Sequence, residues 1–393
     1  MDDPSAGAPV DETDAEPATK LGVHRRWWTA SGIVTVILLI VLFQLWVVKN
    51  RTEIVTMQLT DQTAVNEFLE ANWDSRNEPD AAEVPTGVFV ESLRFVTSTD
   101  VHMTGYVWQR FPETQPEEVP VGFILPELVD STLQRLEYRI AEGDGEVIGW
   151  YFEGVVRQPF EYSDYPFDHK TVWLRLWPRD FAANTVLTPD LAAYPCPRVN
   201  CTQPGDTFGV EETIVLGDWE REDTYFDYFL SSYNTNFGID QYVGQTGFPE
   251  LRYNMLIKRQ FQNAFIVNLV PLFVVAMLAF AAPITTTRNR ERGSIFGFST
   301  AGTIGTVSAL FFVVLLAHIQ LRNQFAGSGV VYIEWFYFLM YVTLLAVAVN
   351  TYLVTAPWTA DKRLVAYGDN LLPKVAYWPF LIGAMVAVTI LGF

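Results

Sequence analysis

Five long apolar runs constrain this chain more than any other feature of its sequence. A helix needs about 20 apolar residues to cross about 30 Å of hydrocarbon, and each run is about that long. The runs cover residues 27–48, 261–284, 294–319, 330–355 and 374–393. Hydrophobic residues make up 50% of the 393 residues, but their concentration in these runs, rather than their total, predicts a membrane protein with five spanning helices.

Basic residues beside the runs predict the orientation of the chain. Three arginines lie between the second and third runs, at 288, 290 and 292, and Lys362 and Arg363 lie between the last two. Positive charge favours the cytoplasmic side, and the basic cluster at 20–26 agrees. We therefore expect a multi-pass protein of the cell (plasma or inner) membrane, with its N-terminus in the cytoplasm and residues 49–259 outside it.

The first run reads as an uncleaved anchor at 27–48. It is too long for the core of a signal peptide, and Lys49-Asn50-Arg51 follows it in place of a small-residue cleavage site. A cleaved signal is the alternative. Residues 1–26 are acidic and rich in Ala and Pro, which predicts a disordered cytoplasmic tail. Residues 49–83 are expected to be a linker that contains a short helix at 62–76.

The segment 84–259 has the pattern of a β domain. Short stretches rich in β-branched and aromatic residues alternate with turn residues, and almost no helical periodicity is present. Predicted strands cover 88–95, 101–108, 149–158, 169–177, 213–220, 225–233 and 251–258. This number of strands predicts an immunoglobulin-like β-sandwich outside the cytoplasm. The proline-rich segment 178–212 is expected to be a long loop.

That loop holds the only two cysteines, Cys196 and Cys201. Outside the cytoplasm so close a pair is expected to form a small disulfide loop. Metal binding is the alternative, but it would have only two thiols and no nearby histidine.

Several function classes have no support in the sequence. The formal net charge of −19 argues against nucleic-acid binding, and it is equally explained by the solubility of an exposed domain. The four histidines form no ligand-spaced cluster, and no nucleophile with a base is recognisable. We therefore expect no enzyme activity, no cofactor and no metal site. Neither the repeats nor the nucleotide-binding loops of a transporter are evident.

Three local features together suggest a mechanism. Tyr165-Pro166-Phe167-Asp168 forms a tight turn between two strands, although such a turn alone is also compatible with an ordinary loop. The last strand ends at Arg259 and runs directly into a spanning helix, so it can transmit force. That helix carries Asn268 and Pro271, and the proline favours a kink.

In these features the chain resembles the pentameric ligand-gated ion channels, the Cys-loop receptor superfamily and its bacterial members. The carriers of the resemblance are the Tyr165–Asp168 turn, the preceding phrase at 154–160, Arg259 and Pro271. It covers about 84–393. It implies a β-sandwich ligand-binding domain on a four-helix pore domain at 260–393, to which the N-terminal helix is an addition. The partners implied are the lipid bilayer, an unknown small ligand, permeant ions and further copies of the chain in a homopentamer.

The resemblance also assigns coupling and ligand-binding roles. Asp168 and Arg259 would form a charge pair between the domains. The turn and the linker 322–329 would pass ligand-induced motion to the pore, with Pro271 in the first pore-domain helix. The ligand would bind under a hairpin at about 233–248. Its aromatic residues could cage a cation or could instead pack the sandwich core. These candidates are Tyr225, Tyr228, Tyr233, Phe237 and Tyr242. Trp219 is expected to be structural.

The second pore-domain helix would line the pore with a hydroxyl-bearing face. The expected pore-lining residues are Glu291, Ile295, Ser299, Gly302, Thr303 and Thr306. Small residues on another face fit an ordinary packed helix as well. The chain departs from the family in lacking the loop disulfide around its turn and in placing Gly302 where a large aliphatic gate residue is usual. A receptor-like or accessory membrane protein that does not conduct is therefore the second hypothesis.

Overall fold

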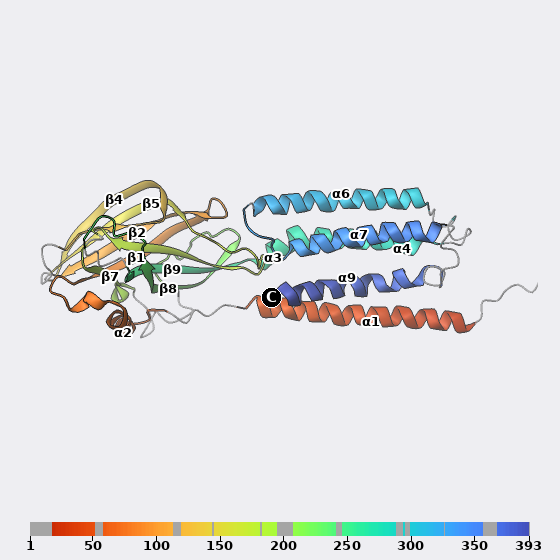
Figure 1. Ribbon diagram of the computed structural model, residues 1–393, viewed down its shortest axis with the longest axis horizontal. Helices are drawn as coiled ribbons and strands as arrows, with labels where there is room; N and C mark the ends of the chain where they lie inside the picture. The colour runs from red at the N-terminus through yellow and green to blue at the C-terminus, as the bar shows by residue number, and fades with distance from the viewer. Residues whose placement is uncertain are drawn as a thin grey trace, which may run out of the picture. The chain divides into compact units, whose positions relative to one another are not determined.

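The computed structural model divides into two compact units, one rich in β-strands and one helical (Figure 1). The β-rich unit contains 50–267 and 320–332, and the helical unit contains 1–49, 268–319 and 333–393. The residues that the structure describes are 18–51, 58–112, 119–143, 145–180, 183–194, 207–240, 246–287, 294, 299–325, 327–356 and 368–392.

The described residues of the β-rich unit form two sheets. The five-stranded sheet has the order β4-β5-β2-β1-β7, and the four-stranded sheet has the order β3-β6-β9-β8. All neighbours pair antiparallel except β1 and β7, which are parallel. The strands of the first sheet are β1 (Ala82–Phe95), β2 (Asp100–Pro112), β4 (Leu128–Glu142), β5 (Gly145–Arg157) and β7 (Thr185–Pro189). Those of the second are β3 (Phe123–Ile124), β6 (His169–Pro178), β8 (Trp219–Ser232) and β9 (Thr246–Arg259).

One hydrophobic core joins residues from both sheets. It includes Val88 and Ile148 from the five-stranded sheet and Leu174, Phe226 and Met255 from the four-stranded sheet. β6 alternates buried and partly buried residues along its whole length, as a strand with one face on a core does. The arrangement is compatible with the predicted sandwich.

The N-terminal part of this unit is more than the predicted linker. Helix α2 (Gln62–Asn72) begins at Asp61, whose carboxylate accepts a hydrogen bond from the backbone N–H of Ala64. Val65 and Leu69 of α2 are fully buried and belong to the same core as the strands. Because the helix buries its apolar face there, the segment from Gln58 onward forms part of the β-rich unit.

Other strand boundaries also differ from the prediction. Most of the predicted strand 213–220 is not a strand, because β8 begins only at Trp219. Gly217, just before it, adopts a left-handed conformation at φ 64° that a strand residue does not take. The expected loop 178–212 contains β7, all five residues of which are buried. Strand β4, the edge of its sheet, was not predicted. Short 3₁₀ helices, η1 (Asp74–Asn77) and η2 (Leu191–Ala193), complete the unit.

Among the residues that the structure describes, five helices are long and apolar enough to cross a membrane, which confirms the five predicted runs. They are α1 (Ala18–Lys49), the continuous span Phe261–Thr285, α6 (Thr300–Gln324), α7 (Glu334–Thr355) and α9 (Leu371–Gly392). The span from Phe261 consists of α3 (Phe261–Ala264), a π-helical segment η3 (Phe265–Leu269) and α4 (Val270–Thr285). The irregularity lies directly before Pro271, whose missing N–H removes a regular helical hydrogen bond.

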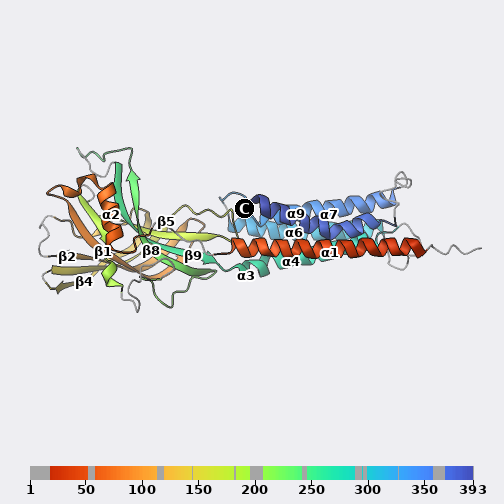
Figure 2. The same ribbon diagram turned by 90° about the horizontal axis from the view of Figure 1, so that it is seen from below.

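Within the helical unit, α1 packs along α9 (Figures 1 and 2). The Ser31 hydroxyl donates to the Val375 carbonyl at 2.5 Å, and Leu38 lies against Gly383. The helices α4, α7 and α9 contact one another. Helix α6 meets α7 through aromatic contacts, such as that of Phe311 with Tyr341. The additional N-terminal helix therefore has a defined partner in this chain.

Candidate functional site

The predicted turn is a compact structure immediately before β6. The Tyr165 N–H donates to the Tyr162 carbonyl at 3.0 Å, and the Phe167 N–H donates to the Asp164 carbonyl at 2.8 Å. The peptide bond between Tyr165 and Pro166 is cis. Tyr165, Phe167 and Asp168 are all buried, so the Asp168 carboxylate is shielded from solvent.

Asp168 and Arg259 form the predicted ion pair, and they form it inside the β-rich unit. The Arg259 guanidinium donates from Nε to Oδ1 at 2.7 Å and from Nη2 to Oδ2 at 3.1 Å, which is a bidentate geometry. Both side chains are almost fully buried, with 7% of Arg259 and 2% of Asp168 exposed. The Arg259 N–H also donates to the Asp168 carbonyl, so backbone and side chains hold the turn to the end of β9.

A second cation shares the Asp168 carboxylate. Lys170 Nζ lies 3.4 Å from Asp168 Oδ2, with only 4% of its side chain exposed. Burial lowers the pKa of Lys170, and the Asp168 carboxylate opposes that shift. Lys170 was not predicted from the sequence, although it lies only two residues after Asp168, at the start of β6.

Aromatic rings surround these charges. The Arg259 guanidinium lies 4.0 Å from the centroid of the Trp219 ring and 4.8 Å from that of Tyr165. Lys170 Nζ lies 4.4 Å from the centroid of Tyr162, and burial raises the pKa of Tyr162 to about 12. We call Tyr162, Tyr165, Asp168, Lys170, Trp219 and Arg259 the turn cluster. Trp219 pairs across the sheet with Arg259, so its expected structural role includes stacking on that cation.

The segment 320–332 packs on the same turn. The Phe325 ring lies 4.5 Å from the ring of Tyr165 and 5.3 Å from that of Tyr162, and only 2% of Phe325 is exposed. The Tyr332 N–H donates to the Ser163 carbonyl at 2.7 Å. The turn thus brings together the end of β9 and the segment 320–332, which contains the linker 322–329 that was expected to act with the turn.

The beginning of the spanning helix reaches the same turn. The Phe167 ring stacks on Phe261, the first residue of α3, at a centroid distance of 4.9 Å. Arg259 and Phe261 are separated by one residue, so the charge contact and the ring contact fix both sides of the junction between strand and helix.

A second group of aromatic and charged residues lies on β6 and β9, just before β4 and in the segment after β8, near the predicted ligand hairpin. The Tyr233 ring packs edge-on against Trp177 at 5.7 Å and against Phe237 at 5.5 Å. Phe237 is 42% exposed and has a positive φ of 53°, so it projects from an unusual backbone position. The Tyr233 hydroxyl donates to Glu250 Oε1 at 2.5 Å.

Carboxylates outnumber cations in this second group. Arg175 lies 2.5 Å from Glu127 Oε1 and 3.2 Å from Glu250 Oε2. Burial raises the pKa of Glu127, against the opposing effect of Arg175. We call Glu127, Arg175, Trp177, Tyr233, Phe237 and Glu250 the hairpin cluster. Glu127, Arg175 and Glu250 were not predicted. The residue directly opposite Arg175 on β9 is Arg252, so the strand pairing alone does not indicate that Arg175 contacts Glu250.

The other predicted ligand residues lie elsewhere. Tyr228 is part of the hydrophobic core, where it stacks on Phe68 and its hydroxyl donates to the Leu187 carbonyl. Tyr225 is also buried, next to Asp227 on β8, and burial raises its pKa to about 12. Only Tyr233 and Phe237 therefore join the hairpin cluster. Tyr242 lies outside the described residues, as do Cys196 and Cys201 with their predicted disulfide.

Helix α6 leaves much of the predicted pore-lining face uncovered. Ser299, Gly302 and Thr306 are exposed and Thr303 is partly buried, whereas Glu291 and Ile295 lie outside the described residues. The buried residues Val307, Leu310 and Val314 follow helical spacing on another face. A Cβ atom added to Gly305 would have no atom within 4 Å, so this glycine is not needed for close helix packing within the described part of the chain.

A polar group between α6 and α7 was also missed. His318 Nε2 lies 3.3 Å from Glu334 Oε1, and its Nδ1 lies 3.1 Å from the Tyr341 hydroxyl. Only 3% of the Glu334 side chain is exposed. The His318 ring also stacks on Tyr337 at 5.2 Å. The sequence shows how far apart these residues are along the chain, but it does not show which faces of α6 and α7 pack against each other.

Comparison with known proteins adds no family. No protein-family model matches the chain, and no curated protein matches it. The residues described above therefore carry the functional argument alone.

Proposed function

We propose that this chain is a subunit of a ligand-gated ion channel that works as a homopentamer of the pentameric family. The β-rich domain, as a sandwich outside the cytoplasm, binds a small ligand, and a pore lined by α6 opens in response. The chain lies in the cell membrane with its N-terminus in the cytoplasm. It needs no enzyme activity and no cofactor for this function.

The observation that carries the proposal is the convergence on one turn. The 162–168 turn contacts the end of β9 through Asp168 and Arg259, and it contacts the segment after α6 through Phe325. A displacement of β9 or β6 would therefore reach the end of α6. This is the connection that a ligand-gated channel requires.

The hairpin cluster supports a cationic organic ligand, such as an amine. Its three aromatic rings offer faces and edges beside two carboxylates that share a single arginine. An organic cation could pair with the remaining negative charge and stack on Phe237, which is 42% exposed. Binding there would act on β6 and β9, the same strands that meet at the turn cluster.

The exposed polar face of α6 supports a role in the pore. Ser299, Gly302 and Thr306 are exposed, and the hydroxyls of Ser299 and Thr306 can each make further hydrogen bonds to water. Copies of the chain around an axis would bring these faces together around water.

Two measurements test the proposal. The purified chain in detergent should have the mass of about five chains of 44.5 kDa, as measured by light scattering corrected for detergent. In vesicles it should pass ions when a panel of amines is added. A monomer or dimer would overturn the pentamer, and a pentamer silent across the panel would support the second candidate, a receptor-like protein that does not conduct.

The role of the ion pair is tested by charge reversal. Asp168→Arg and Arg259→Asp should each abolish the ion response, and the double variant should recover part of it because the pair is restored with opposite order. Matched single and double changes at Asp227 and Arg252, a more exposed bidentate pair on the same sheet, serve as the control. No recovery in a folded double variant would contradict the assigned role.

A further inference from the structure

The two ends of the spanning part of α1 differ in the charge that they expose. Arg25 and Arg26, near its beginning, are both exposed. They precede Trp27 and Trp28, which are 51% and 40% exposed. At the other end the chain reads Lys49-Asn50-Arg51, and of these three residues Arg51 alone is exposed. The beginning of the span therefore presents two guanidinium groups next to two indole rings.

The length of this span places its ends at the depth of the lipid headgroups. The span His24–Lys49 has 26 residues and is therefore about 39 Å long. The hydrocarbon layer is about 30 Å thick, and the bilayer with its headgroups is about 40–45 Å thick. Both ends of the span therefore lie in the headgroup layer, where the phosphates are found. Tryptophan favours this boundary, so Trp27 and Trp28 stabilise the neighbouring arginines at that depth.

Helix α9 brings a further positive charge to the same end. His24 lies beside Gly368, where an added Cβ atom would come within 3.0 Å of the His24 Nε2. Further along both helices, the Ser31 hydroxyl donates to the Val375 carbonyl. These contacts show that α1 and α9 run parallel. Lys374 therefore lies about one helical turn along the bundle from the two arginines of α1.

Positive charge exceeds negative charge at this end. Among the described residues here, Asp369 has the one carboxylate, which accepts a hydrogen bond from the Thr287 hydroxyl at 2.6 Å. Lys374 donates to the backbone carbonyl of Asp369 at 2.8 Å. Three basic side chains, those of Arg25, Arg26 and Lys374, thus accompany one acidic side chain. A ligand of this surface is therefore expected to be an anion.

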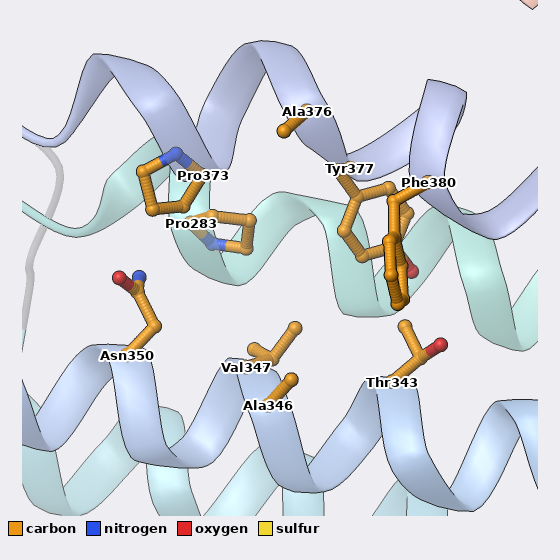
Figure 3. Close-up of a pocket in the computed structure, with 9 residues that line it drawn as sticks. All are labelled: Pro283, Thr343, Ala346, Val347, Asn350, Pro373, Ala376, Tyr377 and Phe380. Carbon is orange, nitrogen blue, oxygen red and sulfur yellow. The ribbon is translucent and has the colours of Figure 1, made fainter.

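Helix α9, the partner of α1, is itself held by other helices. It contacts α4 and α7, and the Tyr377 hydroxyl of α9 donates to the Ala276 carbonyl of α4 at 2.8 Å. In Figure 3, Tyr377 and Phe380 point from α9 toward α7 and line a small cavity of about 160 Å³. The basic side chains are thus carried by two helices with fixed neighbours, so a ligand would meet them in a defined arrangement.

An apolar stripe continues along α1 from the arginines. Ile33 and Ile37 follow Arg26 at steps of seven and four residues, so all three lie on one face of the helix. Ile33 and Ile37 are 61% and 54% exposed. A guanidinium suits a phosphate group, because its donors match the phosphate oxygens. Free phosphate would use the arginines alone, whereas a phospholipid would also cover the stripe. The surface therefore favours a phospholipid.

We propose that the beginning of the α1 span binds an anionic phospholipid, whose phosphate pairs with Arg25 and Arg26 and whose acyl chain lies along Ile33 and Ile37. The charge of the surface selects an anionic lipid over a zwitterionic one, and Lys374 adds to that selection. The site depends on the helices lying in a membrane, but not on ligand gating or ion conduction.

The test uses the full chain in phosphatidylcholine vesicles that contain a trace of photoreactive phosphatidylglycerol, with the reactive group on the acyl chain near the glycerol. After irradiation, the labelled residues are mapped by mass spectrometry. We expect labelling concentrated at 26–37. Excess unlabelled phosphatidylglycerol should suppress it, but the same excess of phosphatidylcholine or of soluble glycerol phosphate should not. Suppression by glycerol phosphate would indicate a site for free phosphate, and equal suppression by phosphatidylcholine would indicate unselective lipid contact. Either result would overturn the proposal.

Single substitutions separate this site from a general attraction of positive charge. Arg25→Gln and Arg26→Gln should each lower the labelling at 26–37 by about fivefold, as expected for one basic residue near an anionic lipid surface. Arg51→Gln, an exposed change near the other end of α1, is the matched control and should leave this labelling unchanged. Arg26→Lys retains the charge and should retain most of the labelling. A loss as large as that of Arg26→Gln would contradict the role of charge.

The double variant Arg25→Gln/Arg26→Gln should show the largest loss of labelling, about 25-fold. Basic residues also direct the insertion of a spanning helix, so circular dichroism checks that this variant folds. If it does not fold, the single variants decide. Unchanged labelling in both single variants, or an equal loss in Arg51→Gln, would overturn the site. None of these readouts requires ion flux.

Discussion

The turn cluster and the hairpin cluster use the same chemical groups in opposite proportions. In the turn cluster one carboxylate, Asp168, serves the two cations Arg259 and Lys170. In the hairpin cluster one cation, Arg175, serves two carboxylates, Glu127 and Glu250.

Burial separates the two clusters further. No more than 7% of any charged side chain of the turn cluster is exposed, whereas in the hairpin cluster Arg175 and Glu127 are 19% and 17% exposed and Glu250 is 6% exposed. Buried charges with full partners hold a structure in place, and a partly open group with excess negative charge can accept a cation from outside. We therefore infer that the turn cluster holds the structure in place and that the hairpin cluster accepts a cation from outside.

The largest effect is expected for Asp168→Asn. The change leaves Arg259 and Lys170 buried without a carboxylate, and should destabilise the protein by about 3–5 kcal/mol. Thermal unfolding in detergent, followed by near-UV circular dichroism, measures it. Asp227→Asn is the control: its pair with Arg252 is more exposed, so about 1 kcal/mol or less is expected. Equal losses of stability in Asp168→Asn and Asp227→Asn would contradict the distinction between the buried pair and the more exposed pair.

Adding Lys170→Met to Asp168→Asn sharpens the same point. Removal of the second cation should recover part of the lost stability, because the remaining Arg259 still stacks on Trp219. Additive losses in the double variant would show that the two charges do not share the carboxylate.

Phe325→Ala should have the next largest effect. The ring is 2% exposed and packs on Tyr162 and Tyr165, so its loss should cost about 3 kcal/mol. Phe229→Ala is the matched control, because that ring is 39% exposed. Unfolding midpoints give both values. A larger loss at Phe229 would contradict the tight packing of segment 320–332 on the turn.

Tyr162→Phe should have a smaller effect that depends on pH. The hydroxyl donates to the Ser98 carbonyl at 2.9 Å, so about 1 kcal/mol should be lost at neutral pH. Burial raises the pKa of Tyr162 from 10.0 to about 12. The associated stability is fully present below pH 10 and is lost as the pH rises through 12, because the unfolded phenol ionises first.

The pH dependence has its own measurement. Stability followed between pH 9 and 12 should fall less steeply in Tyr162→Phe than in the unchanged protein. Some slope should remain, because Tyr225 also has a pKa raised to about 12. Identical slopes would show that Tyr162 ionises freely in the folded protein.

Glu127→Gln should alter stability least, by less than about 1 kcal/mol, because the side chain is partly exposed and Arg175 keeps Glu250. It should nevertheless weaken the response to an organic cation by about tenfold, since the excess negative charge disappears. Since burial raises the pKa of Glu127, acid should abolish the unchanged protein's response at a higher pH than an ordinary glutamate requires. Ion flux in vesicles measures both the response to the organic cation and its dependence on pH. Glu220→Gln, a change at an exposed position on β8, is the control.

The sequence predicted the parts of the fold that local pattern determines. Apolar length located the five helices, and alternation with turn residues located most strands. Strand β7 was missed because it pairs with the distant β1, and because its proline, Pro189, lies in a proline-rich segment that is typical of a loop. Strand β4 was missed because an edge strand carries exposed charges, such as Arg135 and Arg139, among its apolar residues.

The same limit applies to the sites. Asp168 and Arg259 were predicted as a pair from their motifs, and the ion pair is present. Phe325 and Glu127 could not be assigned contacts, because each meets its partners across segments that are far apart in sequence. Tyr228 was placed among the ligand residues although it faces the core, because the phase of β8 depends on its bulge between Arg221 and Asp223.

The pairing of α1 with α9 has a consequence for biosynthesis. The Ser31 hydroxyl and the Val375 carbonyl that join these helices are 344 positions apart. At about 5–20 residues per second, a ribosome needs roughly 20 to 70 s to make α9 after α1 has emerged. During that interval α1 must persist in the bilayer without its partner, which its apolar surface on all sides allows. A ribosome stalled before α9 would leave α1 available to other helices, so complete synthesis is a condition for correct assembly of the bundle.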